Sequence, residues 1–351
     1  MNRMVETQIP HGGNLEEARR LFPDAPEPWV DLSTGINPIA YPMPALPASS
    51  FERLPTPDAH ADLEAAAAES YEATDAAGVV AAPGTQILIS LLPHLRPRSK
   101  VSVLGPTYAE HAHAWRRAGH EVVDIVSPDD DHETDVLVIV NPNNPDGRVL
   151  QRRMLIDLAS RLHRRGGWLV VDEAFADFDS GETMVSSLPN GTIVLRSFGK
   201  TYGLAGIRLG FAVAQPDIAG LVRAALGPWA VAGPAIEVGR KALRDRQWRV
   251  AAAEARANDA AHLDRLLQQA IGTTSMGTTL YRLIENPAAA NLFTHLGRRG
   301  IWTRPFKDNP NRLRFGLPGS DEAWARLETA LAEFASKVER AATSQREEGI
   351  A

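Results

Sequence analysis

The 351-residue sequence contains no cysteine, which excludes disulfide bonds, cysteine-ligated metal centres and thiol nucleophiles. No apolar run approaches the roughly 18 residues that a membrane-spanning helix needs. Residues 1–12 also lack the apolar core of a secretory signal. These absences predict a soluble, cytoplasmic protein, and we expect no metal site and no membrane partner.

Positive charge is also scarce, since the formal net charge is -6. A protein that binds nucleic acid needs a basic surface, so we expect a small-molecule substrate and no nucleic acid. Most basic residues are arginine, and lysine is rare. Because lysine can lose its proton and form an imine, each lysine is a candidate for covalent chemistry. The lysines are Lys100, Lys200, Lys241, Lys307 and Lys337.

The order of segments predicts an α/β fold with a large and a smaller domain. Residues 1–50 are rich in proline and are predicted to form an N-terminal arm and part of the small domain. Residues 51–232 alternate apolar runs with helical segments, which predicts a mostly parallel sheet with helices on both faces. Residues 233–337 are predicted to form a connecting helix and a small α+β domain, and residues 338–351 a polar tail.

Four apolar runs are predicted to be strands buried on both faces. They cover residues 101–104, 136–140, 168–171 and 192–195, with predicted helices at 59–73, 111–118 and 152–165. Ligands bind beyond the carboxyl ends of the strands in such sheets. The residues that follow each run are therefore candidate site residues.

Three successive strand ends each contribute one polar group. Asn144 lies in the loop NPNNPDG, Asp172 follows an apolar run, and Lys200 lies in the glycine-rich stretch SFGKTYGLAGIRLGF. Equal intervals of 28 residues separate the three, as expected when successive βα units build one site. Taken singly, Asn144 could belong to an ordinary turn, and Lys200 could be a solvated charge after a strand.

The triplet Gly199-Lys200-Thr201 resembles the end of a phosphate-binding P-loop. A P-loop requires a second glycine five residues before Gly199, and Val194 stands there. The P-loop interpretation is therefore excluded. A covalent role for Lys200 and a solvated charge remain as alternatives.

Pyridoxal phosphate is the cofactor that needs this collection of groups. It requires a lysine for a Schiff base and an acid that keeps its pyridine nitrogen protonated, for which Lys200 and Asp172 are the candidates. Asn144 is the candidate donor to the phenolic oxygen, and Tyr108 is the candidate for stacking on the ring, with the packing of a turn as its alternative role. The candidates for binding the phosphate carry hydroxyl, guanidinium or helix-start N–H groups: Ser197, Arg208, Gly84, Thr85 and Gln86.

The motifs NPNNPDG, VDEAF and SFGKTYGLAGIRLGF resemble those of fold type I pyridoxal phosphate enzymes. The resemblance extends from His11 to about Leu317. It is to the class I/II branch that holds histidinol-phosphate aminotransferases and the L-threonine-O-3-phosphate decarboxylases of cobalamin biosynthesis. The resemblance implies the same roles for the residues named above, and a homodimer.

Two segments near the start of the chain are similar to the decarboxylases: HGGN at residues 11–14 and DLSTGINP at residues 31–38. The aminotransferases usually carry Asn-x-Asn-Glu-Asn-Pro at the second place. The resemblance thus implies decarboxylation of L-threonine O-3-phosphate to (R)-1-amino-2-propanol O-phosphate. It also implies that Arg314 receives the substrate carboxylate and that Arg304 lies near the substrate phosphate, with a surface salt bridge as the alternative for each. The further candidates for closing over the substrate are His11, Gly35 and Asn37.

Two residues depart from the family pattern. Phe175 stands where the aminotransferases have a tyrosine whose hydroxyl lies near the phenolic oxygen of the cofactor. Leu54 stands where relatives have a tyrosine that reaches the cofactor phosphate of a neighbouring subunit. Two other functions remain open: an aminotransferase acting on histidinol phosphate or a similar amine, and a non-catalytic protein that binds pyridoxal phosphate or a nucleotide.

Overall fold

The computed structural model describes residues 11–130 and 133–348. The chain divides into two compact units, one of residues 39–254 and one of residues 1–38 with 255–351. We call them the sheet unit and the terminal unit and describe each by itself. This division into two units does not test the domain boundaries predicted from the sequence, which remain a prediction. Within the described ranges, no helix is apolar over a length sufficient to cross a bilayer.

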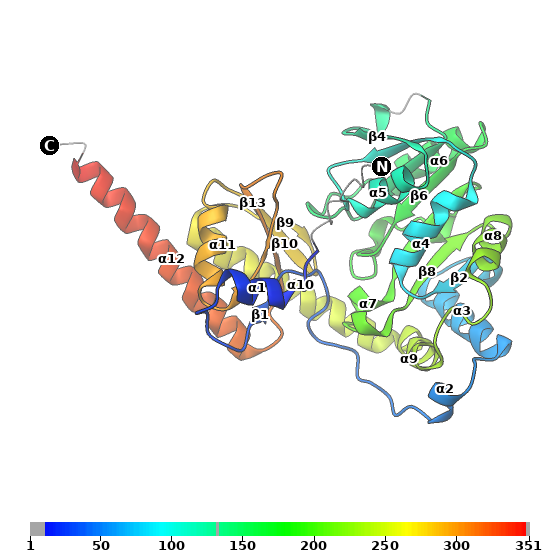
Figure 1. Cartoon of the computed structure of the whole chain (residues 1–351), viewed down its shortest axis with the longest axis horizontal. Helices are drawn as coiled ribbons and strands as arrows, with labels where there is room; N and C mark the ends of the chain where they lie inside the picture. The colour runs from blue at the N-terminus through cyan, green and yellow to red at the C-terminus, as the bar shows by residue number, and fades with distance from the viewer. Residues whose placement is uncertain (1–10, 131–132, 349–351) are drawn as a thin grey trace, which may run out of the picture. The chain divides into compact units, whose positions relative to one another are not determined.

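A seven-stranded sheet lies at the centre of the sheet unit, in the order β2-β8-β7-β6-β5-β3-β4 (Figure 1). Its strands are β2 (Val79–Ala82), β3 (Lys100–Leu104), β4 (Glu121–Ile125), β5 (Val136–Val140), β6 (Trp168–Asp172), β7 (Thr192–Ser197) and β8 (Gly210–Ala214). Only β8 runs against its neighbours in this sheet as described, and the remaining strands are parallel to one another. The predicted mostly parallel sheet is therefore confirmed.

The helices of the sheet unit are α2 (Ser49–Glu52), α3 (Pro57–Tyr71), α4 (Thr85–Leu91), α5 (Glu110–Arg117), α6 (Arg152–His163), α7 (Phe198–Thr201), α8 (Pro216–Leu226) and α9 (Gly233–Arg244). Helix α3 shows why they begin where they do: the Thr56 hydroxyl accepts a hydrogen bond from the Ala59 N–H, and Pro57 takes the first helical position. Helix α10 (Arg246–Ile271) starts in this unit and continues into the other.

Two apolar cores lie on opposite faces of the sheet, because side chains alternate along buried strands. Leu137 and Ile139 pack with helices α3, α6 and α9, whereas Val136 and Val138 pack with helices α4, α5 and α8. Every residue of β5 and β6 is buried. The sequence prediction of strands covered on both faces is confirmed.

The four predicted strands and the predicted helices match observed elements, with ends that differ by a few residues. The sequence analysis did not identify β2, β4 and β8. Strand β4 is an edge strand with exposed Glu121 and Asp124, so it lacks an apolar run. Strand β8 begins within the glycine-rich stretch, so the apolar pattern does not mark its first residue.

The terminal unit contains a four-stranded antiparallel sheet in the order β12-β13-β10-β9 and a parallel pair, β1 with β11. Its elements besides α10 are α1 (Leu15–Leu21), β1 (Val30–Asp31), β9 (Met276–Thr278), β10 (Tyr281–Glu285), α11 (Ala289–Gly297), β11 (Ile301–Trp302), β12 (Arg304–Pro305), β13 (Arg312–Gly316) and α12 (Asp321–Glu348). Leu313 and Phe315 of β13 pack into the core with Leu263 of α10 and Leu327 of α12. Arg314 lies between them in sequence, so its side chain leaves β13 on the opposite face.

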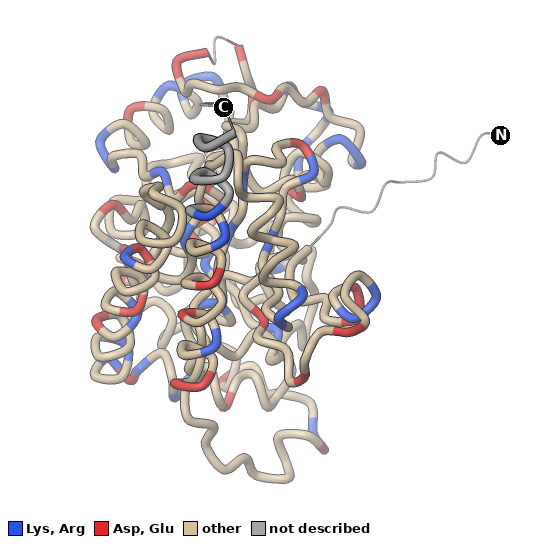
Figure 2. Tube along the Cα trace, turned by 90° about the vertical axis from the view of Figure 1, so that its left-hand side faces the viewer, with Lys and Arg blue, Asp and Glu red and all other residues tan. Residues whose placement is uncertain are grey.

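Basic and acidic residues are interspersed along both units (Figure 2). Ion pairs such as Arg116 with Asp124, 2.6 Å apart, lie at exposed positions. This interspersion agrees with the modest net charge of the sequence.

Candidate active site

The carboxyl ends of neighbouring strands gather the predicted cofactor residues at one edge of the sheet. Strands β3, β5, β6 and β7 are parallel, and they are followed or ended by Tyr108, Asn144, Asp172 and Ser197 respectively. Lys200 follows on the short helix α7. The order of strands thus places the lysine and the acid on adjacent strand ends, as the interval of 28 residues predicts.

Asp172 is buried, with 3% of its surface exposed, and is held by two contacts. Its Oδ1 accepts a hydrogen bond from the Ala174 N–H at 3.0 Å, and its Oδ2 lies 2.9 Å from His111 Nε2. His111 is itself 1% exposed. Because a buried carboxylate is costly unless it is paired, these two contacts keep Asp172 in one orientation.

Lys200 is half-buried, and its ammonium lies over an aromatic ring. The distance from Lys200 Nζ to the centre of the Phe175 ring is 4.7 Å. A cation over an aromatic face is stabilised by about 0.5–1 kcal/mol at a partly exposed site. Phe175, which the sequence analysis noted as a departure from the family pattern, therefore contacts the predicted cofactor lysine through its ring.

The predicted phosphate-binding residues meet where the glycines leave no room for side chains. A Cβ added at Gly84 would lie 2.6 Å from Arg208 Nη2, and one added at Gly210 would lie 2.6 Å from the Thr85 nitrogen. Gly84 also has a φ of 87°, in the region that favours glycine. Ser197 lies directly opposite Gly210 in the β7·β8 pair. Two hydroxyls and a guanidinium are therefore concentrated at one end of β8.

Hydrogen bonds join Tyr108 to the same group. The Tyr108 hydroxyl donates to Gln86 Oε1 at 3.1 Å. Asn143 fixes the loop that carries Asn144, since its amide donates to the Pro106 carbonyl at 3.0 Å and its Oδ1 accepts from the Thr107 hydroxyl at 2.6 Å. The turn that carries Tyr108 and the loop that carries Asn144 are thus held to one another.

In the terminal unit, the two segments typical of the decarboxylases meet at Ser33. A Cβ added at Gly12 would lie 2.3 Å from the Ser33 carbonyl oxygen, and the Gly13 N–H donates to Ser33 Oγ at 2.7 Å. The same carbonyl accepts a hydrogen bond from Arg314 Nη2 at 2.9 Å. Gly12 is therefore required for a close approach of two backbones, and Ser33 links this approach to a predicted substrate residue.

Arg304 and Arg314 lie directly opposite one another in the antiparallel β12·β13 pair. Arg314 is 8% exposed, and its guanidinium carbon lies 5.1 Å from the centre of the Tyr281 ring. Like charges in directly opposed positions repel, and an anion bound between them would offset this cost. The remaining predicted substrate residues of this unit differ in exposure: Gly35 and Asn37 are buried, and His11 is exposed.

A family model described as aminotransferase class I and II matches residues 27–334. The chain belongs to this family. A threonine-phosphate decarboxylase of Pseudomonas aeruginosa is 45% identical over 337 residues, covering 93% of this chain and 98% of the relative. A histidinol-phosphate aminotransferase of Deinococcus radiodurans is 28% identical, covering 91% of this chain and 98% of the relative. The solved structure of L-threonine-O-3-phosphate decarboxylase from Porphyromonas gingivalis superposes with a TM-score of 0.72 at 21% identity, covering 87% and 99%.

These similarities confirm the predicted fold type I architecture, and enzymes of this class I and II family use pyridoxal phosphate. The residues of the sheet unit fit that cofactor. Gly84 and Gly210 allow Arg208 and Thr85 to approach the backbone closely, and Ser197 lies opposite Gly210. We call this group the glycine cradle, and it contains the hydroxyl and guanidinium donors that a phosphate needs. Asp172 is a buried carboxylate on the strand end beside the one that leads to Lys200.

The sequence analysis did not select two residues that contact predicted site residues. His111 contacts Asp172 in the sheet unit, and Ser33 contacts Arg314 in the terminal unit. His111 follows Tyr108 by three residues, its N–H donates to the Tyr108 carbonyl at 3.3 Å, and the two rings lie 6.2 Å apart. The spacing of three residues from Tyr108 was the signal in the sequence that could have identified His111. Ser33 carried no signal of its own, because a serine in DLSTGINP is typical of any turn.

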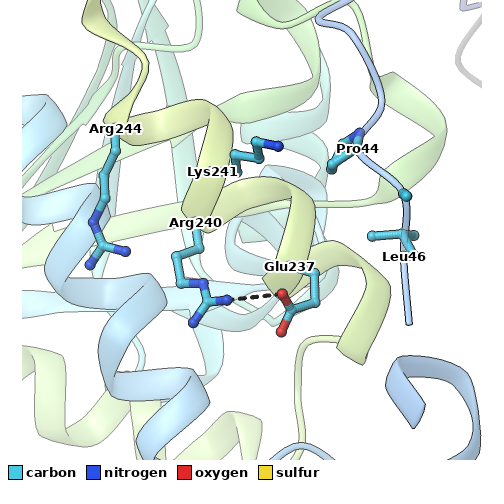
Figure 3. A pocket seen from close by; sticks show the side chains of 7 residues that line it. Pro44, Leu46, Glu237, Arg240, Lys241 and Arg244 are labelled. Carbon is cyan, nitrogen blue, oxygen red and sulfur yellow. Dashed lines mark hydrogen bonds and ion pairs between the residues drawn. The ribbon is translucent and has the colours of Figure 1, made fainter. Parts of the chain in front are cut away.

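A separate cavity of about 470 Å³ lies along helix α9 (Figure 3). Its lining residues are Pro44, Ala45, Leu46, Glu237, Arg240, Lys241 and Arg244. Arg240 points toward Glu237, 2.9 Å away, and also pairs with Asp62 at 2.9 Å. No predicted site residue lines this cavity, so Lys241 serves below as a control lysine.

Proposed function

We propose that the protein is a pyridoxal phosphate-dependent decarboxylase of L-threonine O-3-phosphate. The Cα–carboxyl bond of the substrate breaks, carbon dioxide leaves, and a proton takes its place, giving (R)-1-amino-2-propanol O-phosphate. The observation that carries this proposal is the pair of opposed arginines, Arg304 and Arg314, in a chain that is 45% identical to a threonine-phosphate decarboxylase. Two guanidinium groups suit a substrate with a carboxylate and a phosphate. Histidinol phosphate has no carboxylate.

The proposed roles in the sheet unit follow from the positions of the side chains. When bound, pyridoxal phosphate supplies an electron sink for the electron pair left on the substrate α-carbon. Lys200 Nζ would hold the cofactor covalently and would return a proton to the substrate α-carbon. Asp172, oriented by His111, would hold a proton at the pyridine nitrogen.

The other cofactor contacts are proposed for groups that surround these two residues. Asn144 would donate to the phenolic oxygen, and Tyr108 would stack on the ring. The phosphate is bound by residues around the glycine cradle: Ser197, Arg208, Gly84, Thr85 and Gln86.

The proposed roles in the terminal unit concern the substrate. Arg314, held by the Ser33 carbonyl, binds the α-carboxylate, and Arg304 binds the phosphate. His11, Gly35 and Asn37 exclude water from the substrate. The contact of Gly12 and Gly13 with Ser33 supports this assignment, because it joins the predicted lid segment to the residue that holds Arg314.

The deciding experiment offers L-threonine O-3-phosphate to the protein loaded with pyridoxal phosphate, with no keto acid present. We expect release of carbon dioxide and formation of the amino alcohol phosphate. In a parallel assay with histidinol phosphate and 2-oxoglutarate we expect no glutamate. Glutamate formation without carbon dioxide release in the first assay would overturn the proposal in favour of an aminotransferase.

Arg314→Lys tests the carboxylate contact. We expect KM for L-threonine O-3-phosphate to rise about 10- to 100-fold, since a hydrogen bond to a charged group contributes roughly 1.5–3 kcal/mol and lysine cannot bind a carboxylate in bidentate fashion. Steady-state kinetics measure this. Arg312→Lys on the same strand is the matched control, because Arg312 pairs with Glu285 at 3.1 Å. An equal rise in KM in both variants would contradict the assignment.

We also propose that the protein is a homodimer in the cytoplasm. The absence of cysteine is compatible with a reducing compartment. Phe51 and Leu54 are 68% and 67% exposed, which favours cover by a second copy of the chain. The double variant Phe51→Asp with Leu54→Asp is expected to sediment as a monomer, and the parent as a dimer, by analytical ultracentrifugation. Val126, which directly follows the edge strand β4 and is 78% exposed, gives the control Val126→Asp, which should remain dimeric.

A further inference from the structure

A cluster of buried polar side chains lies beside Asp172 and Lys200. Arg196, on β7, donates from Nη1 to Glu173 Oε2 at 2.6 Å and from Nη2 to Asp177. The Thr201 hydroxyl donates to the other oxygen of Asp177 at 2.6 Å. We call these four residues the Arg196 cluster.

The cluster is almost completely enclosed. Glu173 is 1% exposed, Thr201 is 1% exposed and Arg196 is 4% exposed. Burial raises the pKa of the Glu173 carboxyl above its ordinary value, although the Arg196 guanidinium acts to lower it. Burial alone would lower the pKa of Arg196, but the carboxylates of Asp177 and Glu173 outweigh burial and raise it. One guanidinium is thus shared between two carboxylates in a place that excludes water.

Stability alone is a poor explanation for such a cluster. Replacing a buried ion pair by apolar side chains is often neutral or stabilising, because the cost of removing charges from water is large. Directional contacts, in contrast, fix geometry. The hydrogen bonds of Glu173 extend to the Thr183 hydroxyl and the Met184 N–H, both at 2.6 Å, so the loop after β6 is fixed as well.

Two members of the cluster are adjacent in sequence to the two proposed catalytic residues. Glu173 follows Asp172 directly, and Thr201 follows Lys200 directly. Arg196 joins Glu173 to Asp177, and Asp177 joins the arginine to Thr201. A continuous chain of hydrogen bonds therefore runs from the Glu173 carboxylate to the Thr201 hydroxyl, and these two residues directly follow Asp172 and Lys200 in the chain.

We propose that Arg196 is a positioning residue that fixes the separation of Asp172 and Lys200, through Glu173 on one side and through Asp177 with Thr201 on the other. A cofactor that is held by Lys200 at one end and by Asp172 at the other depends on this separation. An error of about 1 Å in the position of a catalytic group can cost about 100-fold in rate. The inference rests on the proposed role of Lys200.

Thr201→Val is the sharpest test, because it removes one hydrogen bond of the cluster and keeps the branched shape. Deletion of Arg196 would instead leave two buried carboxylates unpaired and threaten folding. The readout is the visible absorbance of the holoenzyme as a function of pH, together with kcat and KM. We expect the midpoint of the titration to move by about 0.5 pH unit or more, and kcat to fall about tenfold with KM within about twofold.

Three further variants complete the test. Thr201→Ser retains the hydroxyl and is expected to restore the midpoint and kcat. Asp177→Asn keeps the shape, removes one charge and is expected to move the midpoint as well. Thr192→Val is the matched control: Thr192 is 0% exposed on the same strand as Arg196, its hydroxyl has no hydrogen-bond partner in the structure, and its variant should behave as the parent.

Two results would overturn the inference. One is a Thr201→Val variant with a lowered melting temperature but the midpoint and kcat of the parent, which would show a structural role only. The other is an equal shift in Thr192→Val, which would show a general packing effect. Borohydride reduction and peptide mapping of the parent distinguish a failure of the proposed function from a failure of the proposed role of Arg196. No adduct on Lys200 would refute the proposed function, whereas an adduct on Lys200 with no shift in Thr201→Val would refute this inference alone.

Discussion

Lys200→Ala is expected to abolish the decarboxylation of L-threonine O-3-phosphate, with a loss in kcat of about 10⁵-fold or more, as when other covalent catalytic groups are deleted. Our assignment gives the covalent role to Lys200, which lies on α7 directly after β7, and to no other lysine. The phosphate contacts proposed for Ser197, Arg208 and the Gly84 turn do not involve Lys200. The variant should therefore still bind pyridoxal phosphate, but reversibly. Dialysis and mass spectrometry after borohydride treatment measure this directly.

Two variants separate a covalent role of Lys200 from a purely electrostatic one. Lys200→Arg keeps a positive charge near the Phe175 ring, but a guanidinium stays protonated and cannot form an imine. We expect it to be as inactive as Lys200→Ala. Lys241→Ala, which removes an exposed lysine of the α9 cavity, should retain the activity of the parent. Substantial activity in Lys200→Arg would refute covalent attachment.

The sequence predicted the central strands and the strand-end residues because both depend on short-range patterns. Val136–Val140 is short, apolar and rich in β-branched residues, which favours a buried strand, and both ends of the predicted strand are correct. Edge strand β4 was missed because exposed charges interrupt its pattern. Local composition thus predicts buried elements better than edge elements.

Contacts between distant segments could not be predicted in the same way. His111 and Asp172 are 61 residues apart, and neither sequence context specifies that one imidazole nitrogen lies 2.9 Å from the carboxylate. Arg314 and Ser33 are 281 residues apart, and their hydrogen bond depends on the packing of β13 against the chain start. The candidate chemical groups could thus be selected from the sequence, but the partners that orient them could not.

The requirement for glycine at position 12 also depends on a contact between distant segments, which the sequence does not predict. A glycine-rich start such as HGGN suggests turns, and turns require glycine only where φ is positive. Gly13 has such a φ, 86°, but Gly12 is required because a Cβ there would lie 2.3 Å from a backbone oxygen of Ser33. The reason lies in another segment of the chain.

Asp172→Asn is the second variant with a large expected effect, a fall in kcat of about 10²- to 10⁴-fold. The amide has nearly the same shape and can still accept the Ala174 N–H bond, but it carries no negative charge with which to hold a proton at the pyridine nitrogen. This fall corresponds to a loss of about 3–5 kcal/mol of transition-state stabilisation, since each 1.4 kcal/mol is about tenfold in rate. Single-turnover measurements with the loaded enzyme give this ratio.

Two comparisons show whether the charge of Asp172 is the cause. Asp135→Asn removes a carboxylate at the amino end of β5, where Asp135 Oδ2 accepts the Lys100 N–H at 2.8 Å, and should leave kcat unchanged. His111→Gln keeps Asp172 charged and removes only an orienting contact, so the expected loss is about tenfold, near the strength of one hydrogen bond. We expect loss of the Asp172 charge to reduce kcat more than loss of its orienting contact. The variants should therefore rank, from most to least impaired, as Asp172→Asn, His111→Gln and Asp135→Asn. A His111→Gln variant as impaired as Asp172→Asn would contradict it, because the imidazole would then be acting as more than a support for the carboxylate.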